Sequence, residues 1–209
     1  MRSNEGAGAR TFTERARRAQ IVECAIEVVA ELGYAQTSIR KIAERVGVAM
    51  SVVLYHFTNK EELVRAIVIE SYHNVIAAVV PAIKAQTSAT GKLRAYITAN
   101  AAFLQSHRLQ YMAVLDIGLS FRTASGGRMD QLEIDPELLG DLATLDLETI
   151  LRNGQENGEF RTFDTRRVAV AIRSALNGAV LETSQDPDFD VLGYGEQLVT
   201  IFDSATRRK

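Results

Sequence analysis

Hydroxyl, aromatic and basic side chains gather between residues 37 and 60 in a pattern suited to contacts with DNA. A predicted short helix, Ala49 to Phe57, leaves five side chains on faces that a core does not need: Met50, Ser51, Val52, Tyr55 and His56. Hydroxyls and an imidazole can bind phosphates or base edges, and a valine can contact a thymine methyl group. Alternatively, Tyr55 and His56 only pack this helix against the next one.

Two short helices must hold these side chains in place. The first has one apolar face, because Ile39, Ile42, Ala43 and Val46 recur at spacings of three, four and seven residues. Ser38 stands where an N-cap belongs, and Gly47 follows the last periodic residue, where a left-handed C-cap is least strained. Two short helices about a tight turn form a helix-turn-helix unit, whose second helix enters the DNA major groove.

The residue types at particular positions of this segment indicate one family of helix-turn-helix proteins. Six groups of residues stand at the spacing of the tetracycline-repressor (TetR) family: Gly33-Tyr34, Thr37-Ser38, Ile42-Ala43, Gly47-Val48, Tyr55-His56-Phe57 and Lys60-Glu61-x-Leu63. The chain resembles this family over about residues 14 to 67. It departs from the usual pattern at Ala49, where the family has serine, and at Leu54, where the family has a phosphate-contacting tyrosine. The resemblance implies that Lys60 and Thr37 contact the DNA backbone.

Other basic side chains of the same segment are further candidates for phosphate contact. Residues 1–60 hold nine Lys and Arg against six Glu, whereas residues 61–209 hold fifteen against twenty acidic residues. A basic N-terminal segment, residues 1–60, and an acidic remainder are expected if only the N-terminal segment contacts phosphate. We expect phosphate contacts from Arg17 or Arg18 and from Arg40 or Lys41. The alternative is that these charged side chains are only exposed to solvent, as is usual on a small helical domain.

Apolar periodicity predicts an all-α fold of about nine helices. Their expected ranges are 13–32, 38–46, 49–57, 59–81, 90–106, 107–123, 135–158, 164–185 and 190–206. Pro81 is expected to end or kink the fourth helix. Residues 1–12 are predicted to be a disordered arm, 13–58 a helix-turn-helix DNA-binding domain, and 59–209 a helical domain for effector binding and dimerisation.

The second domain contains candidates for a ligand pocket. Large apolar and aromatic side chains with polar neighbours make up the set: Tyr72, Ile76, Phe103, His107, Tyr111, Met112, Leu115, Leu119, Arg122 and Asn177, with Asp116 beside them. A mostly apolar cavity with a few convergent polar groups is typical of small-molecule sites. The alternative is that these residues form an ordinary core.

Small residues in series indicate close helix packing in the last two long helices. The resemblance implies that this pair forms a two-fold, four-helix dimer interface. We expect it to include Ala171, Ala175, Gly178, Ala179, Leu198 and Phe202. Packing within one chain is the alternative.

Other classes of function have little support. No His, Cys and carboxylate residues stand at metal-binding spacing, and no phosphate-binding glycine loop or nucleophile motif occurs, so we expect no enzyme, metal or cofactor. No signal peptide and no apolar run near 18 residues is apparent, which predicts a cytoplasmic protein without a membrane partner.

The sequence therefore predicts a one-component regulator, with repression favoured, that a small, mostly apolar effector releases from a pseudo-palindromic operator. It would bind double-stranded DNA as a homodimer. The alternatives are a helical protein-binding adaptor, a constitutive DNA binder without an effector, and an enzyme built on a helical bundle.

Overall fold

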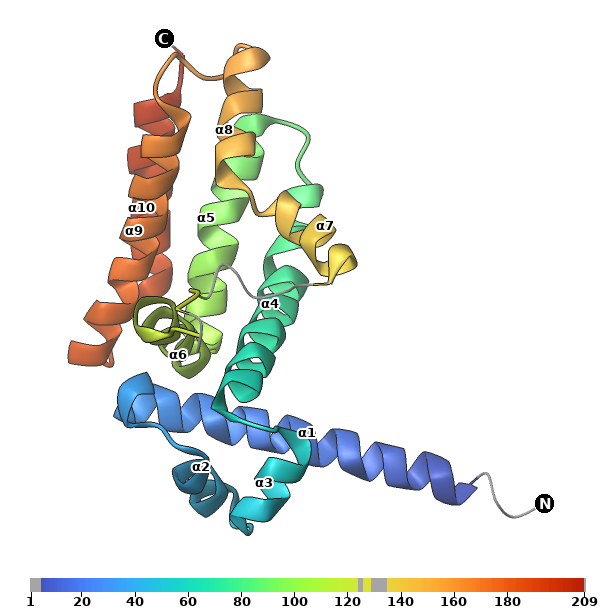
Figure 1. Cartoon of the computed structure of the whole chain (residues 1–209). Helices are drawn as coiled ribbons and strands as arrows, with labels where there is room; N and C mark the ends of the chain where they lie inside the picture. The colour runs from blue at the N-terminus through green and yellow to red at the C-terminus, as the bar shows by residue number, and fades with distance from the viewer. Residues whose placement is uncertain (1–4, 124–125, 129–134, 209) are drawn as a thin grey trace. The chain divides into compact units, whose positions relative to one another are not determined.

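The computed structural model describes residues 5–123, 126–128 and 135–208, and the regular elements in these ranges are all helical (Figure 1). Their order is α1 (Glu5–Leu32), a 3-10 turn η1 (Tyr34–Gln36), α2 (Ile39–Val46), α3 (Met50–His56), α4 (Lys60–Lys84), α5 (Ala89–Ser106), α6 (Arg108–Ser120), α7 (Pro136–Thr144), α8 (Leu147–Glu156), α9 (Thr165–Gln185) and α10 (Val191–Thr206). The all-α prediction is confirmed.

The tenth α-helix arises because the predicted helix 135–158 is two helices. Asp146 lies between the two helices and is the N-cap of α8. Its carboxylate accepts hydrogen bonds from the Glu148 N–H at 3.1 Å and from the Thr149 hydroxyl at 2.6 Å. Aspartate is among the best N-cap residues. The apolar spacing continued across this break, so periodicity alone did not reveal it.

Two further helix boundaries differ from the sequence prediction. The first helix begins at Glu5, so residues 5–12 are helical where a disordered arm was expected. Pro81 does not end α4, which continues to Lys84. A proline removes one N–H donor from the helix but leaves its own carbonyl, which here accepts the Ala85 N–H at 3.0 Å.

The chain divides into two compact units, each described by itself. Unit 1 comprises Met1–Ser71 and Leu109–Glu133, and unit 2 comprises Tyr72–Arg108 and Ile134–Lys209. These limits differ from the predicted domain boundary at residues 58 and 59, because α6 and the first half of α4 group with the helix-turn-helix segment. The core of unit 1 contains six fully buried side chains that lie on its helices or directly follow one: Ile21, Ile42, Val53, Phe57, Ile67 and Ile117.

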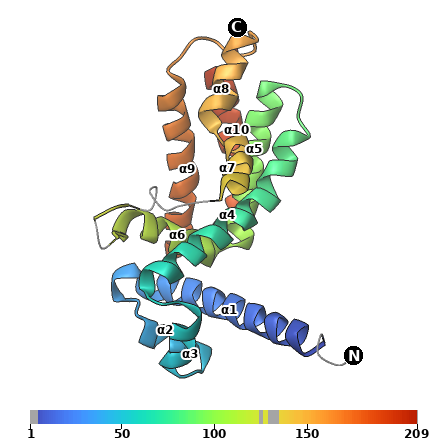
Figure 2. The ribbon, with the colours of Figure 1, turned by 45° about the vertical axis from the view of Figure 1, so that its right-hand side comes forward.

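In unit 2, α5 packs along α8, α9 and α10, which Figures 1 and 2 show side by side. Two glycines permit close packing there. A Cβ atom at Gly195 of α10 would lie 2.7 Å from the Cβ of Ala101 on α5, and one at Gly154 of α8 would lie 2.1 Å from the Phe160 ring. Both distances are shorter than van der Waals contact, so larger residues would force these segments apart.

The N-terminus of α5 is capped from two directions. Ser88 accepts the Gly91 N–H at 3.0 Å, and Glu159 accepts the N–H groups of Ala89 and Thr90, each at 2.9 Å. Because helix N-termini attract negative charge, these bonds favour the ionised carboxylate. The Thr90 N–H is the main cause that holds the pKa of Glu159 below its ordinary value. A residue 70 positions away from Ala89 therefore completes the cap.

One described helix is long and apolar enough to cross a membrane by length and composition. This helix is α4, with a mean hydropathy of 1.6 over an 18-residue window of which 39% is buried. The expectation that no segment approaches this length is wrong for α4. The finding is weak evidence for a membrane span, because the core helix of a globular protein passes the same test.

Candidate nucleic-acid interface

The local structure of α2 and α3 follows the predicted caps. Ser38 accepts the Lys41 N–H at 3.3 Å at the start of α2, and Gly47 ends that helix at φ 76°, donating to Ala43 O at 3.0 Å. A glycine adopts this left-handed conformation without the penalty of a Cβ atom. Val53 and Phe57 are fully buried and anchor α3 in unit 1.

With these anchors buried, the other faces of α3 remain accessible. Met50, Ser51 and Tyr55 are exposed, and Tyr55 is 73% exposed, whereas Val52 and His56 are half-buried. The Tyr55 ring meets the His56 ring edge-on at 5.1 Å, and its hydroxyl lies 3.3 Å from Oε1 of Glu14 on α1. The helix thus presents a hydroxyl, a thioether and a phenol together. This set can contact base edges and phosphates.

The basic side chains of unit 1 differ in how strongly the protein holds them. Arg40 is 81% exposed and forms an ion pair with Glu44 at 2.9 Å. Ion pairs between exposed side chains contribute little to stability. Lys41 donates to Gln36 O at 2.8 Å, and Arg17 donates to Gln20 at 2.7 Å. All three bonds are exposed, so these side chains can turn toward phosphate at little expense of energy.

Arg18 and Arg45 are held by other parts of unit 1. The Arg18 guanidinium lies 4.7 Å from the centroid of the Phe57 ring, a cation–π contact. Arg45 forms ion pairs with Glu27, at 3.2 Å, and with Glu31. The two glutamates hold the pKa of Arg45 above its ordinary value, chiefly through the hydrogen bond to Glu31. Arg45 therefore fastens α2 to α1.

Two residues proposed as DNA contacts by resemblance lie inside unit 1. Thr37 is 5% exposed, and its hydroxyl donates to Gly33 O at 2.8 Å. Lys60 is half-buried, and its Nζ donates to Tyr34 O at 2.7 Å and lies 3.8 Å from the Tyr34 ring centroid. In this structure both polar groups hold the turn between α1 and α2.

The surroundings of Lys60 act on its charge in opposite directions. Burial lowers the pKa of Lys60 from its ordinary value, and the nearby carboxylate of Asp116 partly offsets that effect. Asp116 belongs to α6 and accepts the Tyr34 N–H at 2.5 Å. Sequence reasoning had placed Asp116 beside a ligand pocket. Its contact with Tyr34, 82 positions away, carried no signal in the sequence.

The predicted pocket residues are divided between the two units. Unit 2 contains Tyr72, Ile76, Phe103, His107 and Asn177, and unit 1 contains Tyr111, Met112, Leu115, Leu119 and Arg122. Within unit 2, the Phe103 and His107 rings stack at 4.4 Å. Within unit 1, Leu119 and Arg122 are exposed, and Arg122 donates to Phe121 O at 2.6 Å. A pocket formed by the whole set stays a prediction.

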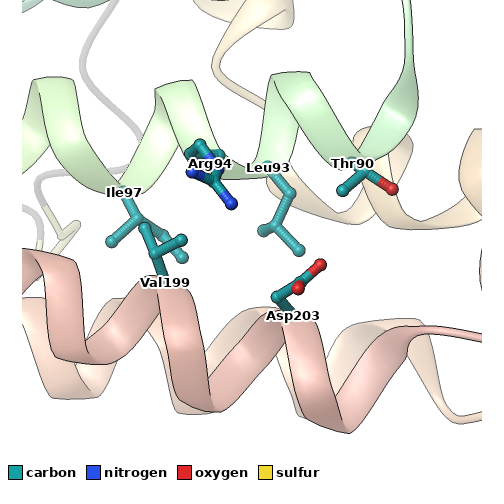
Figure 3. A pocket seen from close by; sticks show the side chains of 6 residues that line it. All are labelled: Thr90, Leu93, Arg94, Ile97, Val199 and Asp203. Carbon is teal, nitrogen blue, oxygen red and sulfur yellow. The ribbon is translucent and has the colours of Figure 1, made fainter.

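Three hollows described in unit 2 contain none of these ten residues. The void between α5 and α10, about 10 Å³, is lined by Thr90, Leu93, Arg94, Ile97, Val199 and Asp203 (Figure 3). It has room for about one water molecule and therefore for no organic ligand. Open depressions of about 390 Å³ near Arg108 and Asp190 and about 460 Å³ near Asp164 and Val170 lie on the surface.

The predicted dimer residues also fall into two groups. Ala179 and Leu198 are buried within the chain itself, so they are core residues of unit 2. Ala171 is exposed, whereas Ala175, Gly178 and Phe202 are half-buried. Sequence reasoning missed the large apolar side chains that α9 and α10 expose: Val170, Leu181, Leu192 and Ile201. Their helical spacing is present in the sequence and could have indicated this surface.

Metal chemistry has no candidate site in the parts of the chain that the structure describes. No three His, Cys, Asp or Glu side chains in residues 5–123, 126–128 and 135–208 are grouped as metal binding requires. Cys24 is half-buried, and burial, followed by the negative charges of Glu27 and Glu23, raises the pKa of its thiol. A raised pKa reduces the thiolate fraction and so the reactivity of this cysteine.

Comparisons with known proteins agree with this geometry. Residues 21–67 match the family model described as "Bacterial regulatory proteins, tetR family". The "Fatty acid metabolism regulator protein" of Bacillus subtilis (strain 168) is 28% identical over 206 residues, which cover 94% of this chain and 98% of that protein.

Solved structures share the fold over nearly the whole chain. The ketosteroid transcriptional regulator KstR2 of Mycobacterium tuberculosis has a TM-score of 0.74 at 21% identity, with 92% of this chain and 96% of that chain covered. FadR from Bacillus subtilis, solved in complex with stearoyl-CoA, has a TM-score of 0.67 at 24% identity, with 89% and 97% covered. The helix-turn-helix geometry, the matched segment and the full-length fold therefore agree: residues 21–67 are a helix-turn-helix segment of the tetR family of bacterial regulatory proteins, and nearly the whole chain has the fold of the regulators compared above.

Proposed function

We propose that this regulator is a cytoplasmic repressor that binds a pseudo-palindromic operator as a homodimer and leaves it when a small molecule binds. The observation that carries the proposal is the accessible face of α3. Met50, Ser51 and Tyr55 are exposed there, while Val53 and Phe57 fix the helix from the opposite side. A short helix held in this way can enter a major groove without deforming its own support.

Dimerisation would use α9 and α10. Leu181 is 63% exposed, and Val170 and Ile201 are also exposed on these helices. A Cβ atom at Gly178 would meet no atom of its own chain within 4 Å, so space for a partner helix exists there. Two copies joined through these helices would present two α3 helices to successive major grooves, as a two-fold operator requires.

An effector with a long apolar part is the ligand class that the relatives favour. The Bacillus subtilis relative is named a fatty acid metabolism regulator, and a FadR of similar fold was solved with stearoyl-CoA. Within unit 2, the predicted pocket residues Tyr72, Ile76 and Phe103 have the matching aromatic and aliphatic chemistry. Release of the operator requires that the effector bind the DNA-free arrangement more tightly, because only differential affinity shifts the equilibrium.

DNA binding is tested with the full-length protein. Duplexes enriched from a random pool should share a two-fold motif, and their log K should fall with log salt at a slope near −5 if a dimer neutralises about six phosphates. Arg40→Ala should flatten this slope. The matched control is Arg152→Ala, which removes an exposed arginine from α8 in unit 2 and should leave the slope unchanged. A flat salt response of the wild type would exclude the proposal.

Effector control is tested on the duplex selected above, with stearoyl-CoA as the probe and free CoA as the control. Coupling of about 1–3 kcal/mol would raise the operator Kd about 5- to 150-fold. By linkage, the operator must weaken stearoyl-CoA binding by the same factor. Binding of stearoyl-CoA that leaves operator affinity unchanged would instead support constitutive DNA binding.

A further inference from the structure

Tyr34 lies at the centre of a hydrogen-bonded chain that joins three helices of unit 1. Its N–H donates to Oδ2 of Asp116 on α6 at 2.5 Å, and its carbonyl accepts from Nζ of Lys60, the first residue of α4, at 2.7 Å. Tyr34 also begins η1, the turn that leads to Ser38, the N-cap of α2. One backbone residue therefore connects α6, α4 and the beginning of the helix-turn-helix.

The surroundings of Asp116 fit this contact closely. Its second oxygen, Oδ1, accepts the Ser120 hydroxyl at 2.9 Å, which fixes the carboxylate on α6. Phe121, fully buried, meets the Tyr34 ring edge-on at 5.9 Å. Gly33 has a φ of 80°, and a Cβ atom there would lie 3.4 Å from Oδ2. A distance of 3.4 Å is ordinary contact, so it is the positive φ, and not a lack of space, that favours glycine at this position.

Both bonds of Tyr34 use groups that would otherwise lack a partner. The first N–H of a helical turn has no acceptor inside that turn, and Asp116 supplies one. The Lys60 ammonium, half-buried, has the Tyr34 carbonyl, the face of the Tyr34 ring and the charge of Asp116 around it. A movement of α6 away from Tyr34 would remove the acceptor and the charge together.

We propose that Asp116, Tyr34 and Lys60 form a latch through which α6 positions the turn before α2 for DNA. This inference rests on the proposed DNA-binding function. Lys60 acts as a positioning residue inside unit 1, and not as the phosphate contact that resemblance implies. Asp116 is the residue of α6 through which a displacement of that helix reaches the helix-turn-helix.

The latch is tested first without DNA, by amide hydrogen exchange of the full-length protein. Asp116→Leu removes the acceptor and should speed exchange of the Tyr34 amide about tenfold or more. Glu44→Leu, the matched control, removes an exposed carboxylate of α2 that pairs with Arg40 and not with Tyr34, and should leave this amide unchanged. Unchanged exchange in Asp116→Leu would overturn the latch.

Asp116→Asn provides a second variant if the leucine substitution disturbs folding. Asparagine keeps a side-chain oxygen acceptor at nearly the same volume but loses the charge, and neutral hydrogen bonds are roughly half as strong as charged ones. The Tyr34 amide should then exchange at a rate between those of the wild type and Asp116→Leu. Exchange as slow as in the wild type would show that the charge of Asp116 is not needed, contrary to the latch.

The role of Lys60 is tested on the duplex that the wild type selects. Lys60→Met and Asp116→Asn should each weaken binding about tenfold with an unchanged salt slope, and the double variant should be little weaker than either single one, because residues of one network are not additive. The opposite result would be that the double variant weakens binding by the product of the two single effects, and that the salt slope flattens by about 0.9 for each phosphate left without its cation. That result would identify Lys60 as a phosphate contact and overturn the latch. If the wild type selects no duplex, the proposed function fails, while the exchange experiment still decides the latch.

Discussion

At the scale of residues, Tyr55 and Thr37 show how differently two candidates for DNA contact are placed. Tyr55 is largely accessible on α3, whereas Thr37 is buried and its hydroxyl bonds to Gly33 O. An accessible phenol can change partners when DNA arrives. A buried hydroxyl cannot do so without leaving its acceptor unpaired, which destabilises the folded protein.

Substitution of the α3 surface should therefore alter specificity. Tyr55→Phe and Val52→Ala are each expected to weaken binding to the selected operator by about 1–3 kcal/mol and to change the preferred bases if these side chains read base edges. Repeated duplex selection with each variant measures the preference. The same motif from both variants would mean that these residues only position the DNA backbone.

Substitution of Thr37 should alter stability. Thr37→Val keeps the shape but removes the hydroxyl, and the unpaired Gly33 carbonyl should lower the free energy of unfolding by about 1–3 kcal/mol. Urea unfolding should show a lower midpoint with an unchanged m value. Thr37→Ser retains the donor and serves as the control. A direct phosphate contact would instead show as weaker DNA binding with wild-type stability.

At the scale of elements, the N-terminus of α5 depends on a carboxylate from a distant part of the chain. Glu159 bonds to the first two N–H groups of α5, and Ser88 bonds to the third. The pKa of Glu159 is lowered in the folded protein, so its contribution to stability is fully present above the unfolded pKa, about 4.3. That contribution is lost as the pH falls below this value and through the folded pKa.

Glu159→Gln is expected to lower the free energy of unfolding by about 1 kcal/mol at pH 7, the upper range for a charge at an accessible helix N-terminus. The difference from the wild type should shrink as the pH falls below about 4.3 and the native carboxylate is protonated. Unfolding measured between pH 7 and pH 3 tests this. A difference that is constant across this range would mean that Glu159 acts through shape and not through charge.

At the scale of the whole molecule, oligomeric state depends on which residues of α9 and α10 the chain uses for its own core. Ala179 and Leu198 pack inside unit 2, whereas Leu181 and Ile201 are exposed. In the proposed homodimer, a second copy of the chain covers the exposed apolar side chains of these two helices in a two-fold arrangement.

Gly178→Leu should convert the expected dimer to monomer with little effect on the fold. Its own chain leaves space at this position, so a leucine would meet only a partner helix and overpack the contact by about 1–3 kcal/mol. Sedimentation at micromolar concentration reports the mass, and circular dichroism reports the helices. Ala143→Leu, on an exposed position of α7, is the matched control. A wild-type monomer would contradict both the interface and the two-half-site mechanism.

Local chemistry in the sequence was sufficient to predict the helix-turn-helix and its caps. Ser38 and Gly47 act on backbone groups within four residues, and Val53 and Phe57 repeat at the helical period, so neighbours along the chain determine their roles. The same reasoning predicted one helix for 135–158, because the apolar period continues across Asp146. At that position the N-cap Asp146 begins a new helix although the apolar period continues.

Contacts between distant residues were decided only by the tertiary structure. No local rule pairs Tyr34 with Asp116 or Glu159 with α5, because such pairs form only after helices pack. The burial of Thr37 and the partial burial of Lys60, whose polar groups donate to backbone carbonyls of the same turn, follow from the same packing. The sequence therefore determined the helix-turn-helix and which surface of α3 is accessible. The structure decided which polar side chains face solvent, since hydrogen bonds between helices depend on their three-dimensional arrangement.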